Sequence, residues 1–392
     1  MKISHVNHSS ILCETENDLL LTDPWLVSNA FQGWSQFPSP NINEVKKIIS
    51  KDNNLSFVLL SHAHDDHVDD IFLSKLKDNV KVIIPKTNNL GLKKRVSNTG
   101  IKEENIIIID NNKVKVGDFY ISAISNGTLS DEDFIFLISN KNNLVIHAND
   151  NWHLYNYQTI EYIKSFIKNN SLSNIILLSQ IGIADSFPLF YERIKPKDKK
   201  KIIENKIKKM CTAFKNNCIE LGIDEGYAYA NQSRFSKLNN LKEINFNPYK
   251  IKDEIIQSFE FKIIQLMPSD KIINGKFIKN HSPQESLLEH RLNNLENQFK
   301  NYSIKKNLQI LPVKFKSMAE NRQTANEIIL YAEDNIWNEI LSGLINLETI
   351  ITGGNGYINK PLNYNMKNEY LLLSKWAYIN QNQAKNDLNI NL

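Results

Sequence analysis

The residues best suited to chemistry lie in one seven-residue segment, Ser61-His62-Ala63-His64-Asp65-Asp66-His67, which holds three histidines and two carboxylates. The apolar run 57–60 precedes it and a helix-like stretch, 68–76, follows, so the pattern predicts a loop at the end of a buried strand. Imidazole nitrogens and carboxylate oxygens suit zinc, iron or manganese better than calcium or magnesium. We therefore expect one or two divalent transition-metal ions here, and a solvated His/Asp loop is the weaker alternative.

A second strand end supplies a further carboxylate, because residues 144–150 read Leu-Val-Ile-His-Ala-Asn-Asp. An unpaired Asp at such a place is costly to bury, and metal ligation or hydrogen bonding offsets that cost. Asp150 alone would be interpreted as the cap of the next turn. Beside the histidine loop, we expect it to bridge two ions.

The elements that must position these residues alternate between strand-like and helix-like patterns over the first two thirds of the chain. The expected strands cover 1–13, 18–23, 57–60, 80–84, 105–109, 114–124, 132–139, 143–149, 174–179 and 225–230, and the expected helices lie near 43–51, 157–170, 196–221 and 281–300. Such an order predicts sheet layers covered by helices, an α/β or α+β fold.

Composition sets the outer limits of the interpretation. A chain of 392 residues with 41% hydrophobic residues suggests one large domain with an extension, or two domains. No apolar run is long enough for a membrane span, and the N-terminus alternates like a strand rather than a signal peptide, so we expect a cytoplasmic protein. The net charge of +4 reflects a lysine-rich composition, and we expect no nucleic-acid partner. The three cysteines form no CxxC pair.

The histidine loop, His8-Ser9-Ser10, Asp23-Pro24-Trp25 and Asn149-Asp150 together resemble the metallo-β-lactamase fold superfamily. Within it, the chain is most similar to the metal domain of CMP-N-acetylneuraminate hydroxylase and of UDP-N-acetylmuramate hydroxylase. The stretches that carry this finer resemblance are 31–34, 178–184 with Phe187-Pro188, 337–343 and 361–365. We expect no Rieske iron-sulfur domain of the kind those hydroxylases carry, because no paired Cys/His motifs occur in these residues.

The resemblance implies a four-layer αββα sandwich over residues 1–265, which would be the catalytic domain, with 266–392 as an extension packed on it. It implies that His62 and His64 bind one ion, that Asp66 and His67 bind the second, and that Asp150 bridges them. Asp66 and Asp150 are the expected catalytic residues, because either would orient the nucleophile.

The ligand set departs from the superfamily pattern at two places. Many superfamily hydrolases have a histidine between the loop and the bridging Asp, where this chain has Asn126, and another after a later strand, where it has Gln180. His147 and His153 flank Asp150 and are candidate substitutes, although a hydrogen-bonded structural role is the better expectation for each.

Two residues near the N-terminus are expected close to the site. The resemblance places His8 near the active-site mouth, on the first strand, where its spacing from His5 would point the two side chains to opposite faces. Asp23 is expected either to orient a ligating histidine or to be a plain turn carboxylate.

Two kinds of chemistry follow. We favour a hydrolase that uses metal-bound water on a small anionic substrate, phosphate- or nucleotide-sugar-like. The alternative is a non-haem iron oxygenase or hydroxylase, with one iron or two, in which His62, His64 and Asp150 form a two-histidine, one-carboxylate set. An oxygenase would need an external redox partner as electron donor. A metal-binding protein without catalysis is the third interpretation, and the sequence specifies neither the native metal nor the oligomeric state.

Overall fold

The computed structural model describes most of the first 280 residues and several segments beyond them. The described residues are 1–27, 29–31, 34–36, 40, 55–87, 91–125, 134–182, 187–189, 191, 194–230, 233–235, 248–280, 309–310, 313–317, 328–337, 350 and 356–359. The helices expected near 43–51 and 281–300 lie outside these residues, as does Asn126.

The first of two central sheets has eight strands in the order β17-β16-β1-β2-β3-β5-β6-β7. Its strands from β17 to β3 pair antiparallel, and β3, β5, β6 and β7 pair parallel. The strands are β1 (Lys2–Asn7), β2 (Ser10–Glu14), β3 (Leu19–Thr22), β5 (Leu55–Leu59), β6 (Lys81–Pro85), β7 (Ile106–Ile109), β16 (Lys271–Ile273) and β17 (Lys276–Ile278).

The second sheet has seven strands in the order β15-β13-β12-β11-β10-β9-β8. Here β11, β12, β13 and β15 pair parallel, while β8 to β11 pair antiparallel. The strands are β8 (Val114–Val116), β9 (Phe119–Ser125), β10 (Phe134–Asn140), β11 (Asn143–His147), β12 (Asn174–Gln180), β13 (Glu225–Tyr229) and β15 (Lys262–Gln265).

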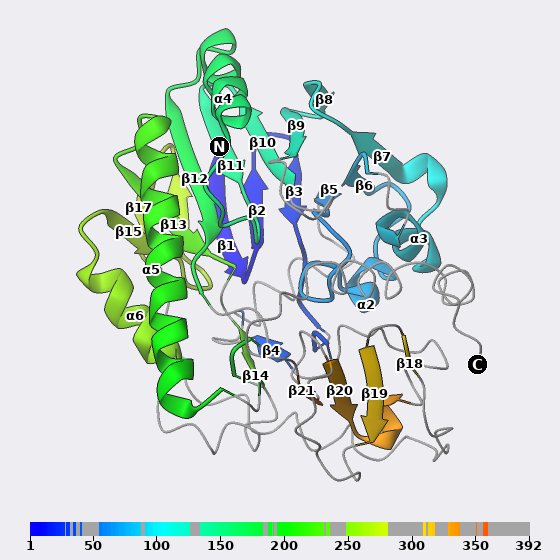
Figure 1. The fold of residues 1–392 in the computed structure, drawn as a ribbon. Coiled ribbons are helices and arrows are strands. Elements are labelled where there is room, and N and C mark those ends of the chain that lie inside the picture. Colours follow the sequence, from blue (N-terminus) through cyan, green and yellow to red (C-terminus); the bar gives the residue numbers. More distant parts are fainter. Residues whose placement is uncertain are drawn as a thin grey trace.

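Helices cover the outer faces of the two sheets, which makes four layers (Figure 1). On the first sheet lie α2 (Asp70–Leu73) and α3 (Gly91–Asn98), followed by a 3-10 turn η1 (Glu103–Asn105), and on the second lie α4 (Tyr157–Asn169), α5 (Pro196–Glu220) and α6 (Pro248–Ser258). The predicted αββα sandwich is confirmed. Among the helices of the described residues, none combines the length and the apolar character needed to cross a membrane.

Alternation along the strands explains how one sequence fills three cores. On β3, Leu20 faces the core between the sheets while Leu21 packs under the helices of the first sheet. On β11, Val145 faces the core between the sheets, whereas Leu144 and Ile146 contact the helices of the second. Because successive side chains point to opposite faces, strands buried on both faces must be apolar throughout.

Two small sheets complete the described part. One pairs β4 (Trp34–Gln36) with β14 (Ser233–Phe235), and the other contains β18 (Gln309–Ile310), β19 (Val313–Ser317), β20 (Ile328–Ala332) and β21 (Gly356–Asn359). The boundary at 265/266 stays a prediction. The β16-β17 hairpin follows it directly in sequence and pairs with β1 of the first sheet.

One expected element was wrong in a way that matters for the site. Residues 1–13 are not one strand but a tight hairpin of β1 and β2, and His8 lies in the turn between them with a φ of 43°. A left-handed residue other than glycine is uncommon, although His is among the types that tolerate it. His8 therefore does not alternate with His5 along a strand, and its side chain is directed by the turn.

Gly226 on β13 permits close packing of α5 on the second sheet. A Cβ at this position would lie 2.4 Å from ring atoms of Phe214, whose side chain is buried on α5. We expect Gly226→Ala to lower the free energy of unfolding by about 1–3 kcal/mol through overpacking, measured by urea denaturation. Adding Phe214→Leu to this variant should recover part of the loss. An unchanged midpoint in the single variant would contradict the packing argument.

Candidate metal centre

The candidate site lies where four strands of the two sheets end. His8 follows β1, Asp23 follows β3, the histidine loop follows β5, and Asp150 follows β11. Backbone bonds fix these ends to one another, since Asp23 N–H donates to the Leu59 carbonyl at 2.8 Å. Side chains from both sheets therefore converge on one point at the end of the sandwich.

Three of the predicted residues form one donor group. The Nε2 atom of His62 lies 2.8 Å from Nδ1 of His64 and 4.0 Å from an oxygen of Asp150. The three potential ligand atoms lie within 4.8 Å of one another. His62 is buried, while His64 and Asp150 are partly exposed, so this group, here called the outer group, faces the surface.

Four residues form a second donor group, here called the inner group. His67 Nε2 lies 3.1 Å from an Asp150 oxygen and 3.8 Å from an Asp66 oxygen. His8 Nε2 lies 3.0 Å from the same Asp66 oxygen. These atoms also lie within 4.8 Å of one another, and all but Asp150 belong to fully buried residues. Asp150 offers an oxygen to both groups, as a bridging residue would.

Several polar atoms of the inner group have no well-formed hydrogen bond. Among the described residues, Nε2 of His8, Nε2 of His67, Oδ1 of Asp66 and Oδ1 of Asp150 are buried without a hydrogen bond. Leaving polar atoms buried and unpaired is costly, and native structures rarely collect several in one place. A divalent cation would satisfy the lone pairs together, so these residues fit a metal ion.

Asp23 organises the histidines from behind. Its carboxylate accepts from the Ser61 amide at 2.7 Å and from the Ser61 hydroxyl at 2.8 Å. Two histidines also meet this carboxylate, since His67 Nδ1 and His147 Nε2 each lie 3.1 Å from Asp23 Oδ2. Asp23 is thus placed as the residue that orients a histidine rather than as a plain turn carboxylate.

Hydrogen bonds orient two of the histidine rings. Because the Ser61 hydroxyl donates to Asp23, it accepts from Nδ1 of His62 at 2.9 Å. His67 likewise directs its Nδ1 to Asp23. Both imidazoles therefore direct Nδ1 to a partner behind the site and Nε2 toward the donor groups, the orientation that a second-shell partner gives a metal-binding histidine.

Burial and neighbouring charges shift the pKa values in opposite directions. Burial would lower the pKa of His67, but Asp150, Asp66 and Asp23 outweigh it and raise that pKa well above its usual value. The pKa of His62 is lowered well below its usual value by burial and by the two neighbouring histidines. Burial would raise the pKa of Asp23 and of Asp66, yet the His67 charge and the hydrogen bonds from histidines lower both. The buried carboxylates of Asp23 and Asp66 are thus stabilised as anions by nearby positive charge.

Arg95 on α3 holds the histidine loop from outside. Its guanidinium donates to the Ala63 carbonyl at 2.6 Å and to the Val68 carbonyl at 3.0 Å. It also donates to Asp65 at 2.9 Å and to both carboxylate oxygens of Asp70, at 2.8 and 2.9 Å. A planar fork of five N–H donors is suited to such a set of acceptors. These contacts therefore hold the loop in shape from the side of α3.

Backbone strain collects at the same strand ends. His8, Asp23, Asn149 and Ala230 all have positive φ, between 36° and 53°, and all are fully buried. Such conformations cost free energy and persist where the surroundings enforce them, which is common at functional sites. His8, Asp23 and Asn149 follow strands that end at the site, and Ala230 follows β13, whose last residue, Tyr229, contacts His147 behind it.

The remaining sequence candidates lie outside both donor groups. His147 is buried behind the site between Asp23 and the Tyr229 hydroxyl, which lies 2.5 Å from its Nδ1, in keeping with a hydrogen-bonded structural role. His153 is exposed and stacks on Trp152. Gln180 ends β12 and donates its N–H to the Asn149 carbonyl at 3.2 Å, beside the strand end that carries Asp150.

Sequence reasoning missed three residues that hold the site, namely Ser61, Arg95 and Tyr229. Ser61 was part of the loop, and its position directly before His62 was an available signal. Arg95 is one of only five arginines in the chain, but nothing in its local pattern connects it with residues 63–70. Tyr229 ends a strand that is far away in sequence.

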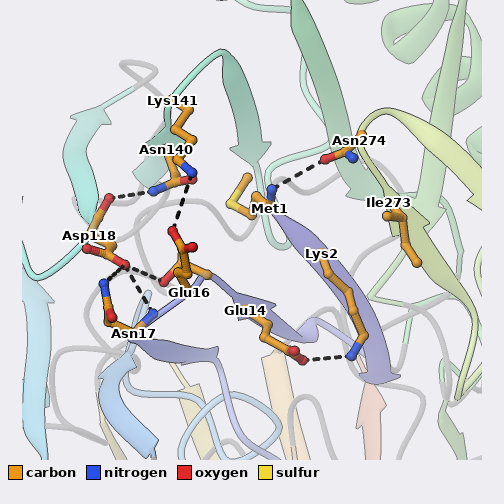
Figure 2. Close-up of a pocket in the computed structure, with 11 residues that line it drawn as sticks. Met1, Lys2, Glu14, Glu16, Asn17, Asp118, Asn140, Lys141, Ile273 and Asn274 are labelled. Atoms are coloured by element: carbon orange, nitrogen blue, oxygen red, sulfur yellow. Dashed lines mark hydrogen bonds and ion pairs between the residues drawn. The ribbon is translucent and has the colours of Figure 1, made fainter.

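A separate polar hollow of about 360 Å³ lies at the other end of β1 (Figure 2). Its polar groups bind one another, since Lys2 pairs with Glu14 at 2.7 Å and Asn17 donates to Asp118 at 3.0 Å. The Met1 amine faces Asn274. The hollow is lined by residues at the start of β1, whereas the candidate metal centre lies beyond its end.

Sequence comparison links the N-terminal part of the chain to known proteins. Residues 2–165 match the model of the beta-lactamase superfamily domain. A UPF0173 metal-dependent hydrolase of Bacillus cereus is 33% identical over 85 residues, which are 22% of this chain and 31% of that protein. A UPF0173 metal-dependent hydrolase of Bacillus anthracis is 32% identical over 85 residues, again 22% of this chain and 31% of that protein. The chain thus spans about a third of the length of these curated relatives.

Two solved structures are similar in fold at low sequence identity. A possible metal-dependent hydrolase from Veillonella parvula is 12% identical with a TM-score of 0.45, covering 69% of this chain and 98% of that one. CmlA, a diiron beta-hydroxylase from Streptomyces venezuelae, is 14% identical with a TM-score of 0.43, covering 71% of this chain and 54% of that one. The family-model match and the four-layer fold support the metallo-β-lactamase superfamily, while the finer likeness to the CMP-N-acetylneuraminate hydroxylase group stays a prediction.

Proposed function

We propose that this protein is a metal-dependent hydrolase whose metal ligands are His62, His64, Asp66, His67 and Asp150. The observation that carries the proposal is the pair of adjacent donor groups that share Asp150. The curated relatives, which are named metal-dependent hydrolases, match over a short segment and support the same class. A metal-binding protein without catalysis is the weaker interpretation, because a structural site is normally closed and the outer group is partly exposed.

The proposed hydrolysis gives each residue of the site a separate role. A divalent ion bound there supplies Lewis-acid polarisation of a substrate oxygen and lowers the pKa of water. Asp150, at 21% side-chain exposure the most accessible carboxylate of the two groups, is placed to accept a proton and orient the attacking water. Asp66 is buried and assists from the inner side by holding its ion. Asp23 and Ser61 keep the Nε2 lone pairs of His62 and His67 directed at the site.

The proposed substrate is a small anionic molecule, phosphate- or nucleotide-sugar-like. One support is the sequence likeness to nucleotide-sugar enzymes. The other is charge, because two bound divalent ions would carry more positive charge than the buried carboxylates of the site carry negative charge. A surplus of positive charge favours an anionic group in the transition state. We propose a cytoplasmic enzyme that needs no nucleic acid.

A second candidate function is oxygenation at non-haem iron. The outer group consists of two histidines and one carboxylate, the set that leaves open positions on ferrous iron in many oxygenases. Such an enzyme would take electrons from a separate redox partner. The two functions differ in the metal they need, which makes them separable by experiment.

Metal loading separates the two functions. We expect protein purified without added metal to retain zinc or manganese and to hydrolyse a generic phosphodiester such as bis(p-nitrophenyl) phosphate, with activity lost on chelation and restored by the ion. Metal content is measured by plasma mass spectrometry. Retained iron together with an oxygen-dependent absorption change after anaerobic ferrous loading would instead favour the oxygenase and overturn the hydrolase.

His64→Ala removes one outer ligand at a partly exposed position. We expect turnover to fall by more than about 100-fold, beyond the effect of losing an outer-shell partner, with an unchanged circular dichroism spectrum. His153→Ala, which removes an exposed histidine outside both groups, is the matched control and should keep full activity. Full activity in His64→Ala would sink the metal-site interpretation.

Arg95 is a positioning residue, because its guanidinium donates to the carbonyls of Ala63 and Val68 and to the carboxylates of Asp65 and Asp70 around the loop. Arg95→Lys cannot reproduce the five contacts, so we expect metal affinity to fall by roughly 10- to 100-fold with the chain still folded. The measurement is calorimetric titration of the metal-free protein with Zn²⁺. Lys94→Ala removes an exposed charge from the same helix and should leave affinity unchanged. Equal affinity in Arg95→Lys would show that the loop holds its shape without the clamp.

A further inference from the structure

We infer that His8 is a metal ligand, so that the two ions are held unequally: the inner ion is closed off by four protein donors, and the outer ion is open. This inference rests on the proposed metal centre and adds to it a ligand that the loop motif does not contain. His8 would take the place of the late histidine that the superfamily pattern expects and that this chain lacks near Gln180.

Geometry places His8 in the inner group rather than near it. Ligand atoms about 2.0–2.2 Å from a zinc ion in a tetrahedral arrangement lie about 3.3–3.6 Å apart. The distances from Asp66 Oδ2 to His8 Nε2 and to His67 Nε2 are 3.0 and 3.8 Å, and Asp150 lies 3.1 Å from His67 Nε2. These separations bracket the tetrahedral value before any ion is present.

The surroundings hold the His8 imidazole in this position. Its left-handed backbone fixes the turn, and its carbonyl accepts from the Ala230 amide at 2.8 Å and from His5 Nε2 at 3.0 Å. The ring packs edge-on against Trp25, at 5.4 Å between centroids. A histidine held this rigidly resembles a preorganised ligand more than a mobile surface group.

The His8 ring has few polar contacts. It is fully buried, and within the described part of the chain its Nδ1 has no hydrogen-bond partner, while its Nε2 meets the Asp66 carboxylate at 3.0 Å. A core histidine with a purely structural role normally satisfies its ring nitrogens, as His147 does with Asp23 and Tyr229. Metal ligation accounts for the difference between these two buried histidines.

Two unequal sites follow from the count and burial of donors. The inner group offers four donors, three of them from fully buried residues, which matches the closed coordination of a retained ion. The outer group offers three donors and is partly exposed, which leaves coordination positions for water and substrate. The outer ion therefore exchanges readily and meets the substrate, while the inner ion stays bound.

The test measures the ions that survive dialysis after loading metal-free protein with Co²⁺. Wild-type protein should retain one ion per chain, and His64→Ala should still retain it. His8→Asn, chosen because Asn also tolerates a left-handed backbone, should lose it, with affinity falling by more than the roughly 10- to 100-fold typical of an outer-shell change. The Co²⁺ absorption bands of the retained ion should change shape in His8→Asn, a readout independent of activity.

The outcomes separate this inference from the proposed function. If His8→Asn keeps the retained ion with wild-type affinity and spectrum, or if His64→Ala loses it, the assignment of His8 and of the inner ion is overturned while a metal enzyme remains. If wild-type protein retains no ion and gains no activity from any, the metal centre itself fails. Circular dichroism of each variant, with His153→Ala as control, identifies a variant that has lost its fold.

Discussion

The structure depends on balancing the negative charge of carboxylates that are buried where the two sheets end. Asp23 and Asp66 are almost completely excluded from solvent, and in the described part of the chain their ion-pair partners are all histidines. Burying carboxylates is costly unless positive charge is supplied. The histidines supply part of it, and the unpartnered donor atoms of the inner group show where more is required. The histidine loop, the turn at His8 and the residues with positive φ all lie around these buried carboxylates.

The sandwich makes such a point possible. Strands buried on both faces have apolar side chains along their length, so polar side chains can gather only where the strands end. The ends of β1, β3 and β5 come from one sheet and the end of β11 from the other, and the hydrogen bond that the Asp23 carboxylate accepts from His147 joins the two. The candidate ligands therefore come from both sheets, while Arg95 holds the histidine loop that carries most of them.

The sequence was informative where the pattern was local. The apolar runs 57–60 and 144–146 predicted buried strands, and the density of histidines between 62 and 67 predicted a ligand loop after the first of them. The fold class and its four layers were predicted and confirmed. The role of Asp23 stayed divided between two alternatives, because whether it meets His67 depends on the pairing of β3 with β5, which no short pattern encodes. Arg95 was missed for the same reason, since only the packing of α3 brings it to the loop.

The error at His8 is the more instructive one. Residues 1–13 contain no glycine, proline or Asn-Gly pair, and the polar run Asn7-His8-Ser9-Ser10 was interpreted as part of a strand although Asn and Ser favour turns. The turn forms nevertheless, with a left-handed histidine at its tip, and this costs conformational free energy that a glycine would avoid. The turn places the buried His8 imidazole 3.0 Å from Asp66, within the inner group, where a histidine at alternating strand positions would not have been expected. A local pattern could not reveal this, because the contact depends on the hairpin and on the histidine loop, which lie about sixty residues apart in the chain.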